Sequence, residues 1–142
     1  MDISKFVAQK NLSILWFINA AILALIFIVF TILDRFDMQT AKGWERYSQN
    51  VIPISTLMLG TFYINNNKQQ ENKKVNIFYY RLSYSISIFY LSVLYLTILL
   101  APLAFAYQSI SIIDLLDKSK IYLILIQGLL TYSLGLFFNK EA

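Results

Sequence analysis

Four long stretches of the chain carry no charged side chain: residues 11–33, 47–67, 82–113 and 121–139. The hydrocarbon core of a bilayer is roughly 30 Å thick, and a helix rising about 1.5 Å per residue needs ~20 apolar residues to cross it. Each stretch reaches or nearly reaches that length. The sequence therefore predicts an all-α membrane protein, a four-transmembrane-helix bundle with little mass outside the lipid.

Composition supports this class of protein. Hydrophobic residues make up 58% of the chain and charged residues 14%, whereas an ordinary soluble domain is about 25% charged. A soluble protein of 142 residues has too little polar surface to bury four such helices. We expect one integral membrane domain over residues 1–142, with spans at about 11–33, 47–65, 81–105 and 120–138 and a cytoplasmic loop at about 66–80.

Two of the spans are less regular than the others. The second is strongly apolar only over residues 51–64, so a re-entrant or interfacial segment competes with the full crossing that we favour. The third stretch is too long for one crossing. Pro102 removes a helical hydrogen bond and disfavours helix before it, which predicts a kink or a stop. Residues 108–117 would then lie at the membrane interface.

Small residues recur at helical spacing on the first, second and fourth spans. Such faces let another helix approach closely. A bundle this small buries little of its own surface, so we expect a homo-oligomer. The predicted helix-packing or oligomer-interface residues are Ala20, Ala24, Thr56, Gly60, Gly128 and Gly135.

Uncharged polar residues inside the spans form a second group, which includes a stripe on one face of the third span. Hydrogen bonding between packed helices is one explanation for them. The other is a narrow polar path through an oligomer. The residues are Asn19, Ser83, Ser87, Tyr90, Thr97 and Gln127.

The distribution of basic residues predicts the orientation. Lys and Arg concentrate on the cytoplasmic side of membrane proteins. With four spans, seven of the 12 basic residues share a side with both termini, which places both termini in the cytoplasm. These seven are Lys5, Lys10, Lys68, Lys73, Lys74, Arg81 and Lys140. The Asn-, Lys- and Ile-rich usage is typical of an AT-rich bacterial genome, which suggests a multi-pass protein of the bacterial inner membrane.

The missing residue types argue against catalysis. The chain has no cysteine and no histidine, and all eight carboxylates lie outside the four stretches. It therefore lacks the commonest general base and metal ligand, and it has no membrane-embedded carboxylate to couple transport to ions. No phosphate-binding loop or nucleophile motif occurs. We expect no enzyme activity, no cofactor and no metal site.

The basic residues also suggest what the protein contacts. Net charge is +4, but the bases are spread over both sides, so a nucleic-acid partner is not expected. Lys68, Lys73, Lys74 and Arg81 are candidates to contact lipid headgroups or a cytoplasmic protein. We predict a small non-enzymatic membrane subunit that oligomerises and anchors, or signals to, a cytoplasmic partner. The alternative is an oligomeric pore or channel.

In size and span number, the chain resembles small four-span subunits of bacterial membrane-based antiviral systems, such as the Kiwa type. In those systems a membrane protein works with a cytoplasmic effector. The resemblance is one of architecture along the whole chain, and it implies a role in antiviral defence.

Overall fold

The structure is a computed structural model that describes residues 2–36, 38–64 and 74–139. Within these residues the chain forms four long helices and two short strands. In chain order they are β1 (Asp2–Ser4), α1 (Lys5–Ile32), α2 (Thr40–Ile64), β2 (Lys74–Asn76), α3 (Ile77–Gln108) and α4 (Ile112–Asn139). Each helix begins before the corresponding predicted span. The all-helical fold class is confirmed, and the only strands in the described residues are three residues long.

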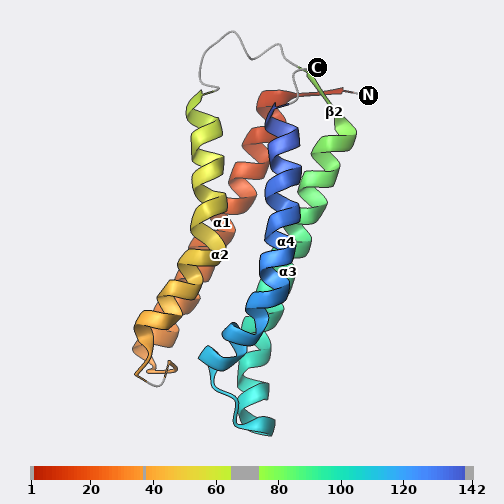
Figure 1. Ribbon diagram of the computed structural model, residues 1–142. Coiled ribbons are helices and arrows are strands. Elements are labelled where there is room, and N and C mark those ends of the chain that lie inside the picture. The colour runs from red at the N-terminus through yellow and green to blue at the C-terminus, as the bar shows by residue number, and fades with distance from the viewer. Residues whose placement is uncertain (1, 37, 65–73, 140–142) are drawn as a thin grey trace.

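The four helices form two hairpins that lie side by side (Figure 1). Helix α1 packs along α2, and α3 packs along α4. Contact between the hairpins is less extensive and runs mainly from α2 to α4 and from α1 to α3. Strands β1 and β2 pair antiparallel, with Ile3 opposite Val75. This pairing joins the start of the chain to the segment before α3, so the N-terminus lies near the end of α4.

Three of the helices are long and apolar enough to cross a membrane: α1, α3 and α4. Their outward faces carry large exposed apolar side chains, such as Leu25, Leu99 and Leu125, and lipid would cover these in a bilayer. This arrangement is that of a multi-pass membrane protein. Helix α2 is one continuous helix that includes Pro53, but its first turns carry Lys42, Glu45 and Arg46. Its crossing of the membrane stays a prediction.

The expected stop at Pro102 is wrong. Helix α3 continues through Pro102 to Gln108 and ends at Ser109, which adopts the left-handed conformation at φ 53°. The Ser109 N–H donates to the Phe105 carbonyl at 3.0 Å, as in other helix ends of this kind. A proline removes one backbone hydrogen bond, and packing against neighbouring helices lets a membrane helix accommodate that loss.

Residues 108–117 do not form a separate segment, and their position at the membrane interface stays a prediction. Helix α4 starts at Ile112, immediately after a three-residue connection. The Ser111 hydroxyl oxygen accepts a hydrogen bond of 3.1 Å from the Asp114 N–H, which caps the new helix. Ile113 and Leu116 are buried in the bundle instead of facing lipid. Ser111, which caps this helix two residues after Ser109, is the sequence feature that indicates the early start of α4.

Candidate functional site

The polar stripe predicted on the third span lies inside the bundle. Four of its residues are buried: Ser83, Ser87, Tyr90 and Thr97. Each forms a hydrogen bond with a residue of another helix of the same chain. The bond of Ser87 joins α3 to α1, that of Tyr90 joins α3 to α2, and those of Ser83 and Thr97 join α3 to α4. The stripe holds the helices together within one chain, as expected for polar groups that cannot reach water in a bilayer.

Two of these bonds meet where the hairpins cross. The indole Nε1 of Trp16 donates to the Ser87 hydroxyl at 3.2 Å. The Tyr90 hydroxyl donates to the backbone carbonyl of Asn50 at 3.1 Å. The Trp16 and Tyr90 rings are themselves in contact, with centroids 5.9 Å apart. This group connects α1, α2 and α3 in one network.

The other two bonds connect α3 to α4. The hydroxyls of Ser83 and Ser133 lie 2.9 Å apart, and those of Thr97 and Tyr122 lie 3.0 Å apart. Because the two pairs lie more than three turns apart on α3, they fix the register of the hairpin at two levels.

The remaining two polar candidates behave differently from the stripe. Asn19 donates to the Leu15 carbonyl of its own helix at 2.7 Å. Gln127 donates from α4 to the Gln49 carbonyl of α2 at 3.3 Å. Gln127 therefore bridges the two hairpins, whereas the hydrogen bond of Asn19 stays within its own helix. Asn19 also lines a separate surface hollow of about 310 Å³ beside Tyr84.

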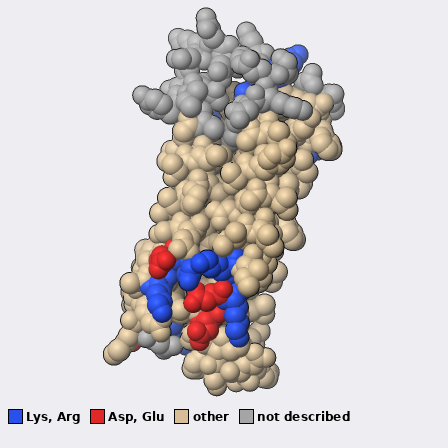
Figure 2. Space-filling model, in the orientation of Figure 1, with Lys and Arg blue, Asp and Glu red and all other residues tan. Residues whose placement is uncertain are grey.

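A cluster of charged residues lies at the end of the bundle opposite the strands (Figure 2). Arg46 of α2 forms an ion pair with Asp117 of α4 at 2.5 Å. The same guanidinium donates to the Gln49 side-chain oxygen at 2.8 Å, and Gln49 in turn donates to Glu45 at 2.9 Å. Arg46 is thereby held between the two helices.

Beside this ion pair is a small polar cavity of about 250 Å³ between α2 and α4. It is lined by Arg46, Gln49, Asn50, Leu116, Lys120, Ile124 and Gln127. No carboxylate lines it among the described residues. The Arg46 Nε is buried and has no hydrogen-bond partner. The cavity therefore concentrates donors and positive charge.

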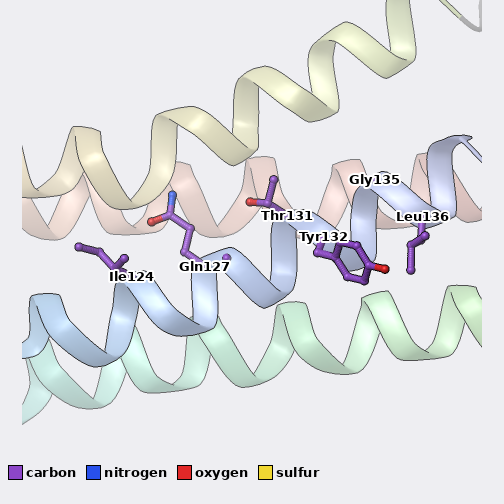
Figure 3. Close-up of a pocket in the computed structure, with 7 residues that line it drawn as sticks. Ile124, Gln127, Thr131, Tyr132, Gly135 and Leu136 are labelled. Carbon is purple, nitrogen blue, oxygen red and sulfur yellow. The ribbon is translucent and has the colours of Figure 1, made fainter.

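A larger groove of about 810 Å³ follows α4 away from this cavity. It is lined by Ile124, Gln127, Gly128, Thr131, Tyr132, Gly135 and Leu136. Gln127 and Thr131 point from α4 toward α2, as Figure 3 shows. Ile124 and Gln127 line both spaces, so the cavity and the groove lie next to each other along α4. We take the two together as the candidate site.

The predicted small-residue faces have different surroundings. Ala20 packs against the core, and its carbonyl accepts a hydrogen bond from Tyr47 of α2 at 3.1 Å. Ala24 is half-buried, and Thr56 is exposed. A Cβ added to Gly60, Gly128 or Gly135 would meet no atom within 4 Å among the described residues. The α1 face is thus used inside the chain, whereas the glycines of α2 and α4 are open.

The predicted basic contacts lie at the other end of the bundle. Lys74 in β2 and Arg81 in the second turn of α3 are both exposed. Lys68 and Lys73 lie outside the described residues.

The sequence reasoning did not find the cavity and the groove. It treated Arg46 and Lys120 only as charges beyond the span ends, and Gly128 and Gly135 only as packing residues. The spacing of residues on α4 could have indicated these two spaces. One face of this helix carries a lining residue at every third or fourth position: Lys120, Ile124, Gln127, Thr131 and Gly135. The partner helix could not be identified in this way.

Among the described residues, no group of three or more His, Cys, Asp or Glu side chains could hold a metal ion. Comparison with protein-family models, with curated proteins and with solved structures gives no match.

Proposed function

We propose that this chain is a small non-enzymatic membrane subunit that assembles with further copies and anchors a cytoplasmic protein. The observation that carries the proposal is the pairing of β1 with β2. It brings the first residues of the chain and the segment before α3 together at one end of the bundle. Residues far apart in the sequence thereby form one surface, which we call the strand end: β1, β2 and residues 77–81.

The strand end has the chemistry of a protein contact. Lys74 and Arg81 supply exposed positive charge, and Phe78 is 62% exposed. Each strand also has an outer edge without a strand partner in the described residues, and such edges can pair with an added strand of another protein. Under the positive-inside rule, this end lies on the cytoplasmic side of a bacterial inner membrane.

Co-purification tests the anchor. The full-length chain, extracted in mild detergent, is expected to retain a soluble protein. Replacing residues 65–74 with a Gly-Ser linker of equal length, or combining Lys74→Ala with Arg81→Ala, should release that protein. Lys118→Gln, which changes an exposed lysine at the opposite end, should not. Equal retention by the Lys74→Ala/Arg81→Ala variant and by the wild type would contradict the proposal.

Assembly into a homo-oligomer draws support from α2. Thr56 and Gly60 are exposed one turn apart on this helix, and a Cβ added to Gly60 would meet no atom of the described residues within 4 Å. A second helix could approach closely there. Light scattering in mild detergent should give a mass above that of one 16.5 kDa chain. A monomeric mass would remove this part of the proposal.

The pore alternative draws less support from the bundle. Four of its expected lining residues, Ser83, Ser87, Tyr90 and Thr97, are buried and hydrogen-bonded within one chain. Ion flux from liposomes holding the full chain tests it, and we expect none. The antiviral role rests on the architectural resemblance alone, and it predicts that deleting the gene raises the plating efficiency of a phage that the host otherwise resists.

A further inference from the structure

The cavity and the groove differ in chemistry along the length of α4. At the cavity end, the Arg46 Nε has no partner, and Lys120 makes no ion pair or hydrogen bond with the described residues. Asp117, three residues before Lys120 on α4, is paired with Arg46 instead. Lys120 therefore leaves a positive charge uncompensated at the mouth of the cavity.

The groove end, in contrast, has no charged side chain among its described lining residues. Gly128 and Gly135 leave the helix backbone uncovered, and Ile124, Tyr132 and Leu136 border it. From Ile124 to Leu136 the helix rises about 18 Å at ~1.5 Å per residue. One leaflet of hydrocarbon is half of the roughly 30 Å core, or about 15 Å. The groove is thus about as long as one leaflet is thick.

We infer that the groove binds one anionic phospholipid. Its phosphate lies at the exposed Lys120 beside the cavity, and one acyl chain lies along α4 over Gly128 and Gly135. Charge complementarity selects a lipid over the helix of a second copy, because a bare helix face offers no phosphate to the uncompensated Lys120. This inference requires the chain to lie in a membrane, but it does not depend on the proposed cytoplasmic partner.

Native mass spectrometry of the full-length protein in mild detergent tests the inference. The protein is exchanged into phosphatidylglycerol or phosphatidylcholine with identical acyl chains. We expect phosphatidylglycerol to be retained about fivefold better, which corresponds to the ~1 kcal/mol of one basic residue near a lipid surface. Lys120→Gln should abolish that preference. Lys118→Gln is the matched control, because it removes an exposed lysine that does not line the cavity.

A second variant tests the acyl part independently. Gly128→Leu fills the groove without a clash, because a Cβ there meets no atom within 4 Å. It should lower the retention of both lipids, whereas Leu129→Phe, on a neighbouring exposed position outside the groove, should not. The inference fails if the two lipids are retained equally, or if Lys120→Gln behaves like Lys118→Gln. It also fails if Gly128→Leu lowers the oligomeric mass while lipid retention is unchanged, since a second copy would then occupy the groove.

These outcomes are separate from those of the anchor. The lipid variants lie at the end of the bundle opposite the strands, so they should leave retention of a soluble partner unchanged. Loss of the partner in the Lys74→Ala/Arg81→Ala variant should likewise leave the lipid preference intact.

Discussion

The indole of Trp16 and the hydroxyl of Ser87, which lie 71 positions apart in the sequence, form a buried hydrogen bond of 3.2 Å between α1 and α3. Both side chains are almost completely excluded from the surface. Contact between the two hairpins is sparse along α1 and α3. This bond is therefore one of the main contacts that join the first hairpin to the second.

Replacing either partner of this bond should destabilise the bundle. Trp16→Phe and Ser87→Ala should each cost about 0.6 kcal/mol, the average for interhelical hydrogen bonds in membranes, and at most about 1.7 kcal/mol for the bond itself, with Trp16→Phe also losing some packing. The double variant should lose less than the sum of the two, because the shared bond can be lost only once. Thermal unfolding in detergent measures this, with the exposed Ser85→Ala as control. Strict additivity would show that the bond contributes nothing.

Gly43 should not tolerate a side chain. A Cβ at this position would lie 2.7 Å from the Phe36 ring. That ring is fully buried against Phe27 and Phe30, so it has no free space to move into. We expect Gly43→Ala to cost about 1–3 kcal/mol through overpacking. Ala41→Ser, at an exposed position of the same helix, is the control and should leave the melting temperature almost unchanged. Equal melting temperatures for the two variants would contradict the packing at Phe36.

The ion pair of Arg46 with Asp117 should contribute modestly to stability. Asp117 is 43% exposed, so solvent screens the pair, and either single charge reversal should cost about 1 kcal/mol or slightly more. The exchanged variant, Arg46→Asp with Asp117→Arg, should recover part of that loss. The melting temperature in lipid-free detergent at low and high salt is the measurement. No recovery in the exchanged variant at low salt would mean that the contact does not act through charge.

Two substitutions at the junction between α3 and α4 should change the stability of the protein in opposite directions. Ser111→Ala removes the cap on the Asp114 N–H and should cost about 1 kcal/mol. Ser109→Gly relieves a left-handed residue at φ 53° and should stabilise the protein by a few tenths to about 1 kcal/mol. Chemical unfolding in mixed micelles compares the two variants. A destabilised Ser109→Gly variant would argue against the left-handed helix end.

Labelling single cysteines tests the orientation directly, because the chain has no native cysteine. A membrane-impermeant thiol reagent applied to intact cells should modify Lys118→Cys but not Phe78→Cys, both of which are exposed. Permeabilising the cells should make both react. The reverse labelling pattern would contradict the predicted orientation, because the strand end would then lie outside the cell.

Much of this architecture follows from local pattern. The charge-free stretches predict long apolar helices, and hydrophobicity over about 20 residues acts independently of what each helix packs against. The same reasoning was wrong at Pro102, because it weighed one lost hydrogen bond and could not include the packing that carries α3 on to Gln108. The polar stripe could be recognised from its spacing and is buried in the structure, but its packing and pore explanations predict the same residue spacing.

The sequence by itself determined that this chain is helical and that it carries helices long and apolar enough to cross a membrane, because these properties are summed along single helices. It predicted four such spans, and three of the helices meet the criterion in the structure. Only the tertiary structure decided the partners: Trp16 with Ser87, Arg46 with Asp117, and β1 with β2. It also decided that Gly128 and Gly135 face a groove leading to Lys120. Such relations depend on which faces of separate helices meet, and helical spacing within one segment carries no information about the helix opposite.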